Sequence, residues 1–287
     1  MNASVRISPT LPALDADRVA RLAQDCLRLE LRTFPKPGLV SHVDRGAHRD
    51  MDAHSFERSA AAIQPFLARL ADAGAALRPM PTLRRIGLEA EAAMLSATGG
   101  VNTHRGAIFC LGLLCAAAGA SRSGSHAGRS LGEIVALRWG NAIEAGPIPL
   151  RSHGSDALRR HGASGARGEA MAGFPSLYRI GLPALRAGAR LRGSDPEAAR
   201  VQCLFALIAG VQDTNLLHRG GAGGASFASD AAHAFLQRGG VGRPDWRDAA
   251  TRVHRDFVAR HLSPGGCADL LAACLFVDRF DTELAAA

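Results

Sequence analysis

The spacing of the apolar residues constrains the fold of this chain more than any other feature. Apolar residues recur every three or four positions, which is the period of one face of an α-helix. Three clear stripes are Val19, Leu22, Cys26 and Leu29; Leu83, Ile86, Ala90 and Met94; and Val201, Leu204, Ile208 and Val211. No segment alternates apolar and polar residues for long, and β-branched residues are sparse beside the many alanines. We therefore predict an all-α protein with about ten helices.

Local signals mark where these helices begin and end. The expected starts are Asp15 or Asp17, Thr82, Asp195-Pro196 and Ser263-Pro264, and the second stripe is expected to stop at Gly99-Gly100. The last helix is expected over about residues 265–280. Residues 55–77 are also helix-like, although Pro65 must kink or split that helix because proline has no backbone N–H.

No linker, shift in composition or internal repeat divides the chain, so residues 1–287 are expected to form one domain. With 47% apolar residues, a chain of 287 residues can bury a sizeable core. Glycine, proline and polar residues gather in three expected loops, 35–52, 99–106 and 213–224, and in a weaker one over 153–174. Helical scaffolds usually present function on their loops, so these segments carry the candidate site.

The sequence predicts neither a membrane segment nor disulfide bonds. The longest apolar run, 107–118, is shorter than the roughly 20 residues that span a bilayer. Residues 1–14 contain two prolines and no continuous apolar core, so no signal peptide is expected. The six cysteines form no C-x-x-C pair and mostly follow apolar helical patterns, which favours small buried hydrophobes over disulfides or zinc ligands. We expect a soluble cytoplasmic protein.

The charge balance favours an anionic partner. The chain has 34 Lys and Arg against 26 Asp and Glu, and every one of the 34 except Lys36 is an arginine. A nucleic-acid interface would cluster these residues and interleave aromatic side chains, whereas here the arginines are scattered and aromatics make up 5%. The pattern indicates a small polyanion and a solvated arginine-rich surface; a nucleic-acid-binding module is the weaker alternative.

The first loop combines a stiffened lysine with a cluster of acids and histidines. Prolines on both sides of Lys36 restrict its backbone, which suits an ammonium group that holds phosphate; the alternative is a solvated loop lysine. The stretch that follows contains His42, Asp44, His48, Asp50 and Asp52. Such density can bind Mg²⁺ or deprotonate a hydroxyl, and Asp44 and Asp50 are the two carboxylates with no helix-capping role to explain them. Asp52 is better placed as the N-cap of the next helix, with His54 in its first turn.

The second loop ends where an apolar helix is expected to begin, near Ala107. Backbone N–H groups and the positive end of the helix dipole make such a position an anion site. Four consecutive residues add donors for a phosphate chain: Asn102, Thr103, His104 and Arg105. The alternative is a polar turn that caps a buried helix. The Walker A pattern is absent, and no strand precedes a G-x-G-x-x-G motif.

The third loop offers metal ligands and phosphate ligands together. Asp213 and Asn215 carry oxygen atoms of the type that Mg²⁺ accepts, and His218 with Arg219 can meet phosphate. The glycines that follow allow a ligand to approach the backbone closely. The remaining polar candidates are expected on the surface: Glu89, Glu91, Arg167 and Glu169.

Six segments of these loops and helix starts form an ordered set. They are residues 35–40 (PKPGLV), 46–52 (GAHRDMD), 100–107 (GVNTHRGA), 167–170 with 173–175 (RGEA, GFP), 213–215 with 218–219 (DTN, HR) and 263–266 (SPGG). Together they resemble the family of ATP:dephospho-CoA triphosphoribosyl transferases, over about residues 20–281. Arg105 stands where many members have lysine. Ser41 stands where many have aspartate, so an acidic role there moves to Asp44.

The resemblance implies an enzyme that joins two nucleotides. The 2′-hydroxyl of 3′-dephospho-CoA attacks the ribose C1′ of ATP, adenine leaves, and the product is the precursor of a prosthetic group. That group serves the acyl carrier subunit of malonate decarboxylase or citrate lyase, and residues 37–52 look closer to the malonate decarboxylase branch. Implied partners are ATP, 3′-dephospho-CoA, a downstream phosphoribosyl-dephospho-CoA transferase and the acyl carrier protein, with neither nucleic acid nor membrane. A homodimer is compatible with this pattern.

The resemblance also suggests roles for the candidate residues. Phosphate oxygens would meet Lys36, Arg105 and Arg219, while Mg²⁺ would bind Asp213, Asn215 and Asp50. Either Asp50 or His48 would take the proton of the 2′-hydroxyl, and adenine release would depend on Asp50 and Asp213. A Mg²⁺-dependent nucleotide N-glycosyl hydrolase, with water as acceptor, stays open, as does a structural helical scaffold.

Overall fold

Helices make up the regular secondary structure of the residues that the structure describes. The computed structural model describes residues 15–123, 126–147 and 165–285. Its helices are α1 (Ala16–Leu31), α2 (Ala53–Ala75), α3 (Met80–Ala97), α4 (Arg105–Ala120), α5 (Leu131–Glu144), α7 (Gly165–Met171), the π-helix η2 (Leu177–Gly181), α8 (Leu182–Leu191), α9 (Pro196–Gly210), α10 (Thr214–Gln237), the 3₁₀-helix η3 (Gly240–Gly242), α11 (Trp246–Ala259) and α12 (Gly265–Ala285). No strand occurs in those three ranges, so the all-α prediction is confirmed, with eleven α-helices where about ten were expected.

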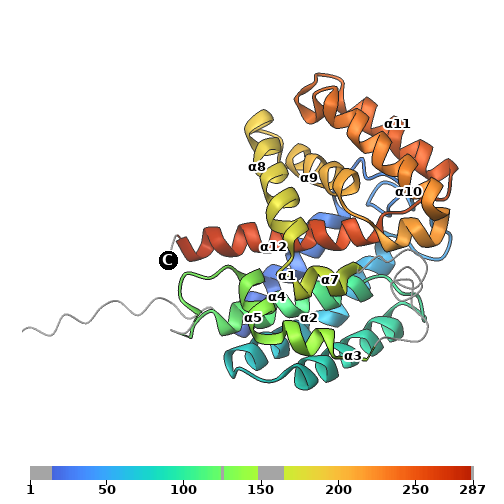
Figure 1. Cartoon of the computed structure of the whole chain (residues 1–287). Coiled ribbons are helices and arrows are strands. Elements are labelled where there is room, and N and C mark those ends of the chain that lie inside the picture. Colours follow the sequence, from blue (N-terminus) through green and yellow to red (C-terminus); the bar gives the residue numbers. More distant parts are fainter. Residues whose placement is uncertain (1–14, 124–125, 148–164, 286–287) are drawn as a thin grey trace, which may run out of the picture.

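The last helix, α12, organises the molecule. It crosses the middle of the structure, with α1–α5 and α7 on one side and α8–α11 on the other (Figure 1). It packs against α1 and α4 in the first group and against α9 in the second. The first turns of α12 therefore lie where polar segments from both groups can meet.

Capping side chains start several helices where the sequence predicts them. Asp15, Asp52 and Asp195 each accept a backbone N–H from the first turn of α1, α2 and α9. Each such cap satisfies a donor that the helix leaves free and contributes about 1 kcal/mol. Pro65 lies inside α2 without splitting it: the helix runs unbroken for 23 residues.

One continuous cluster of buried apolar side chains runs through both groups of helices. Its centre is α4, which is buried on almost every side. Small residues let α2 approach α4 closely: a Cβ on Gly74 would lie 1.8 Å from the carbonyl oxygen of Ala116. A Cβ on Gly119 would lie 2.0 Å from that of Ala71. All six cysteines are buried and free, as predicted. None of the described helices is both long and apolar enough to cross a membrane.

The third expected loop, residues 213–224, is in fact largely helical. Residues 214–237 form α10, in which Gly221 adopts φ +59° and interrupts the regular helix. Gly220 and Gly224 have low helix propensity, yet both lie in α10, where a Cβ at either position would crowd the side chain of Leu262. The helix expected near Ala107 begins at residue 105. Part of the fourth expected loop is α7, while residues 153–164 and the N-terminal residues 1–14 lie outside the described ranges.

Candidate active site

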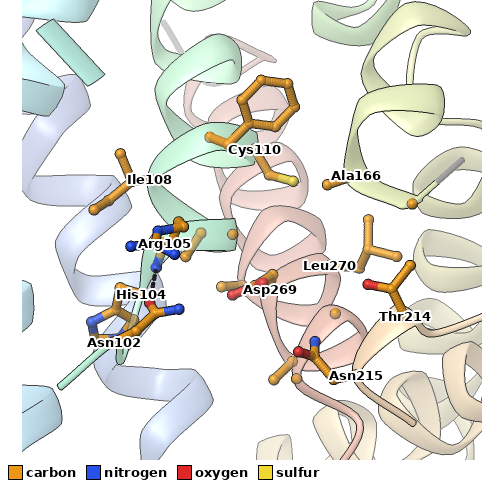
Figure 2. Close-up of a pocket in the computed structure, with 18 of the residues that line it drawn as sticks. Asn102, His104, Arg105, Ile108, Cys110, Ala166, Thr214, Asn215, Asp269 and Leu270 are labelled. Atoms are coloured by element: carbon orange, nitrogen blue, oxygen red, sulfur yellow. Dashed lines mark hydrogen bonds between the residues drawn. The ribbon is translucent and has the colours of Figure 1, made fainter. Parts of the chain in front are cut away.

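A cavity of about 1170 Å³ lies where α4, α10 and α12 begin. Its wall also includes the segment around residues 48–51, the start of α7, and parts of α2 and α3. Figure 2 shows Asp269 of α12 between two sets of side chains, Asn102, His104 and Arg105 on one side and Thr214 and Asn215 on the other. Three segments that are distant in sequence thus bring their polar residues to one space.

Asp269 is the central carboxylate of this cavity, and no sequence motif singled it out. It accepts the backbone N–H of Ala107, so its charge faces the positive end of the α4 dipole. Gly106 makes this contact possible, because a Cβ there would lie 1.9 Å from Asp269 Oδ2. Burial and the nearby charges of Glu30 and Asp213 raise the pKa of Asp269. A carboxylate that holds its proton more strongly than usual is a better base when ionised.

The anion site predicted at the start of α4 is therefore partly filled by the protein itself. Asp269 takes the N–H of Ala107, and Asn102 Oδ1 takes the N–H of Arg105 at 3.1 Å. The guanidinium of Arg105 pairs with Glu91 at 2.9 Å. Glu91, which was expected on the surface, lines the cavity, so that expectation was wrong. Arg105 remains on the rim, where its side chain is exposed enough to meet a second anion.

Asp213 ties α10 to α12. Its Oδ1 accepts the N–H groups of Asn215 at 2.7 Å and Leu216 at 3.3 Å, and its Oδ2 accepts the N–H of Cys267 at 2.8 Å. Burial raises the pKa of Asp213, and these three hydrogen bonds oppose the rise. Since most of its lone pairs are already engaged, Asp213 chiefly positions the two helix starts and offers little room to a metal ion.

Lys36 lies apart from the cavity surface. Its side chain is 1% exposed, and its ammonium lies 2.5 Å from Glu30 Oε1. Burial lowers the pKa of Lys36 and raises that of Glu30, while their mutual attraction opposes both shifts. Glu30 lines the cavity and Lys36 does not. The prolines around Lys36 thus hold an ammonium against a buried carboxylate, and in this structure it is not presented to phosphate.

His48 lines the cavity and links two other residues, Ser263 and Arg219, in a hydrogen-bonded cluster, here called the latch. Its Nε2 lies 2.8 Å from Ser263 Oγ, and its Nδ1 lies 3.1 Å from Nη2 of Arg219. Arg219 Nη1 also donates to the carbonyls of Ala47 and His261. Burial and the Arg219 charge lower the pKa of His48 to about 4. His48 is therefore neutral at pH 7, and both ring nitrogens are engaged, so the latch role suits it better than that of a base.

His104 is a second neutral histidine in the wall. It is 4% exposed, its Nδ1 lies 2.6 Å from Ser59 Oγ, and Phe56 packs edge-on against its ring. Burial and the charge of Lys36 lower its pKa to about 3. Its Nε2 has no hydrogen-bond partner within the described residues. His104 can therefore offer a neutral ring nitrogen to a ligand, but not a positive charge.

The remaining candidates divide between cavity and surface. Asp50 lines the cavity with a side chain that is 61% exposed, 3.7 Å from His48. Asn215 and Thr103 line it as well, whereas His218 lies outside it on the exposed face of α10. Asp44 bonds to His254 at 3.0 Å, away from the cavity.

Nine of the eleven residues selected from the sequence thus meet in one cavity, and Lys36 and His218 do not. Arg167 and Glu169 of α7 also line it, so their expected surface position was wrong. Arg167 donates to three carbonyls at the end of α5, and Glu169 accepts from Ser176. Asp269 had one sequence signal: it is the only acid in the otherwise apolar stretch 265–277.

The cavity is lined by both carboxylates and arginines, which suits a phosphate ligand that binds together with a metal cation. Its lining contains six carboxylates, Glu30, Asp50, Glu91, Glu169, Asp213 and Asp269, and four arginines, Arg84, Arg105, Arg167 and Arg219. No group of three or more His, Cys, Asp or Glu side chains is placed to hold a metal ion, as far as the described residues go. Mg²⁺ commonly binds through one or two carboxylates together with substrate phosphates, and this lining fits that mode.

Comparison with known proteins gives one consistent result. The family of ATP:dephospho-CoA triphosphoribosyl transferases matches residues 16–286. A protein of Azotobacter vinelandii is 41% identical over 94% of this chain and 94% of its own, and one of Pseudomonas aeruginosa is 40% identical over 97% and 96%. Another, of Citrobacter koseri, is 38% identical over 94% and 93%. All three are named probable 2-(5″-triphosphoribosyl)-3′-dephosphocoenzyme-A synthase. No solved structure matches the chain.

Proposed function

Since the chain belongs to the family of ATP:dephospho-CoA triphosphoribosyl transferases, we propose that it joins ATP to 3′-dephospho-CoA inside the cavity at Asp269. The 5-triphosphoribosyl group of ATP moves to the 2′-hydroxyl of 3′-dephospho-CoA. The product is 2′-(5″-triphosphoribosyl)-3′-dephospho-CoA, and free adenine is released.

The reaction exchanges one bond at C1′ of ATP for another. The C1′–N9 bond breaks, and adenine leaves with its electron pair and takes up a proton. The 2′-oxygen of the acceptor forms the new bond to C1′ and loses its proton. Positive charge develops on the ribose as adenine departs, as it does in glycoside hydrolysis. The site therefore needs a base for the hydroxyl, negative charge near C1′, and groups that fix the triphosphate.

The observation that carries the proposal is the convergence of these groups in one cavity. Its volume of about 1170 Å³ exceeds the roughly 300–1,000 Å³ of a site for a single drug-sized ligand, as two nucleotides require. Nine residues selected from sequence motifs line it together with Asp269.

We assign the base to Asp269. Its carboxylate is held in place by the N–H of Ala107, and its pKa is raised by burial and by Glu30 and Asp213. While ionised, it places negative charge beside the ribose as adenine departs, and it then takes the proton of the 2′-hydroxyl as the new C1′–O bond forms. Asp50 is the alternative base, although its side chain is largely exposed.

We place the triphosphate of ATP at the rim of the cavity. Arg105 and Arg219 lie there with Asn102 and Thr103, and together they present donors to phosphate oxygens. Asp50 and Asn215 would hold Mg²⁺, which would supply positive charge to the triphosphate, while Asp213 positions the two helix starts. Since Mg²⁺ commonly binds through few protein ligands together with substrate phosphates, it would bind together with ATP.

The product would serve malonate decarboxylase rather than citrate lyase. The support is the likeness of residues 37–52 to that branch of the family. A phosphoribosyl-dephospho-CoA transferase would then attach the group to the acyl carrier protein, in the cytoplasm where ATP is available. Deletion of the gene in its host tests the branch: loss of the prosthetic group from the malonate decarboxylase carrier is expected, and loss from the citrate lyase carrier alone would overturn the assignment.

The reaction itself is tested with purified protein, ATP, Mg²⁺ and dephospho-CoA, followed by mass spectrometry. Adenine released only when dephospho-CoA is present, together with an equal amount of the adduct, is the expected result. Adenine released without an adduct would overturn the proposal in favour of a nucleotide N-glycosyl hydrolase. No adenine under either condition would refute both activities.

A further inference from the structure

The cavity has an apolar arm that the chemistry at Asp269 does not use. It runs between α3 and α4, which are joined by residues 98–104 and pack against each other. Along this arm the two helices present Met80, Leu83, Gly87, Ile108, Phe109 and Leu113 to the cavity. From Arg105 to Leu113 the helix rises about 12 Å, so the arm extends well beyond the polar end.

This arm is open space lined by apolar groups. A Cβ added to Gly87 would meet nothing within 4 Å, although Gly87 lines the cavity. Beside it, Leu88 also lines the cavity and is 59% exposed, which makes it one of the few large apolar side chains left in water. An apolar surface of this kind beside a polar site is typical of a place that a ligand covers.

The arm joins the polar end without interruption. Glu91 lies one turn beyond Gly87 on α3, and it pairs with Arg105 at the start of α4. A ligand at Asp269 can therefore send an extension past this ion pair and between the two helices. The extension must be largely uncharged, because the groups that face it along α3 and α4 beyond Glu91 are aliphatic or small apart from Phe109 and the single cation Arg84.

We propose that this arm binds the pantetheine chain of dephospho-CoA and so distinguishes the acceptor from the donor. The inference rests on the proposed function. Of the two substrates, the acceptor alone carries a long uncharged chain with methylene and methyl groups, attached through its 5′-diphosphate. The uncharged part of ATP is its adenine ring, which favours aromatic faces, and Phe109 is the only aromatic residue in α3 or α4. Aliphatic walls fit the pantetheine chain better.

The arm predicts how substitutions at Gly87 act. Gly87→Leu adds a side chain to the empty part of the arm without straining the helix, and Gly87→Ala fills less of the same space. Small changes of volume in an apolar pocket alter discrimination about 10–200-fold. We expect Gly87→Leu to raise the KM for dephospho-CoA at least about tenfold, Gly87→Ala to have a smaller effect, and neither to change the KM for ATP.

A truncated acceptor makes the test specific. ADP keeps the ribose hydroxyls and diphosphate of the acceptor but lacks the pantetheine chain. The wild type should prefer dephospho-CoA to ADP as acceptor, and Gly87→Leu should remove most of that preference while leaving the efficiency with ADP unchanged. Ala92→Leu, which places the same leucine side chain at an exposed position of α3 outside the cavity, is the control. Circular dichroism verifies that each variant is folded.

Three results would overturn the inference: unchanged KM values in Gly87→Leu, an equal loss with ADP, or a rise confined to ATP. Calorimetric binding of dephospho-CoA and ADP to both proteins, without turnover, separates this inference from the proposed function. The wild type could make no adduct and still bind dephospho-CoA more tightly than ADP, with Gly87→Leu abolishing that difference. This result would support pantetheine binding in the arm and refute the proposed reaction. Equal binding of both acceptors by the wild type would refute the arm.

Discussion

Replacing Asp269 with asparagine should remove turnover while the fold survives. Asparagine has nearly the same shape, and its Oδ1 can still accept the N–H of Ala107. The change removes the negative charge and the ability to take a proton. A positioned base contributes about 10²–10⁴-fold to a rate. We therefore expect kcat/KM for adduct formation to fall by about 100-fold or more, which corresponds to about 3 kcal/mol of transition-state stabilisation.

The same substitution should leave the free energy of unfolding unchanged or raise it. Burial and the charges of Glu30 and Asp213 raise the pKa of Asp269 above its ordinary value of 3.8. A carboxyl group with a higher pKa in the folded state loses folding stability as pH rises from its unfolded pKa to its folded pKa. At pH 7 the ionised group therefore costs stability, and asparagine carries no such charge. Activity and stability should move in opposite directions.

Asp278→Asn supplies the matched control, since it makes the same chemical change on the same helix. Asp278 pairs with Arg186 at 3.3 Å and lies outside the cavity. Exposed ion pairs of this kind contribute at most about 1 kcal/mol, so its turnover should equal that of the wild type. Steady-state kinetics with ATP and dephospho-CoA, together with thermal unfolding at pH 7, measure both effects. Near-normal turnover in Asp269→Asn would refute the assignment, and a lowered Tm would refute the stability argument.

Three further predictions follow from the same contacts. Gly106→Ala should displace the Asp269 carboxylate, since the new Cβ would lie 1.9 Å from Oδ2; kcat/KM should fall at least about tenfold, and in the control Gly223→Ala, where a Cβ meets nothing, it should not change. Chelation of Mg²⁺ by EDTA should stop turnover without lowering Tm, because no described group of side chains forms a metal site of its own; a large fall in Tm would reveal a resident structural metal. Stability should fall as pH drops from about 6.5 to about 4, because the unfolded chain binds a proton at His48 before the folded chain does. His48→Gln should make that fall smaller by up to about 3 kcal/mol in chemical denaturation, and an identical pH profile would contradict the assigned pKa.

Helical periodicity and capping residues were enough to predict the fold class, because both act locally. Asp15, Asp52 and Asp195 cap helices as predicted, and the apolar stripes face the core. The stretch after Asp213 was predicted wrongly as a loop because its glycines have low helix propensity. The close packing of Gly220 and Gly224 against Leu262 is a tertiary contact, and the sequence alone does not show it.

The candidate site shows the same division between local and tertiary information. Nine residues selected from sequence motifs line the cavity. Lys36, selected because a proline lies on each side of it, is instead buried against Glu30. Its role depends on the fold of α1, which no local pattern shows. Asp269 was missed for the opposite reason, since it lies within an apolar helix and gains its importance from the start of α4. Sequence motifs supplied most of the residues of the candidate site, whereas its central carboxylate became visible only in the structure.

The most direct test of the central claim is a crystal structure of Asp269→Asn with Mg²⁺, ATP and dephospho-CoA bound. A variant that binds both nucleotides but reacts slowly should hold them in place. The account predicts both in the cavity, with the acceptor 2′-oxygen about 3–3.5 Å from C1′ of ATP and beside residue 269. Nucleotides bound elsewhere, or a 2′-hydroxyl directed away from residue 269, would contradict it.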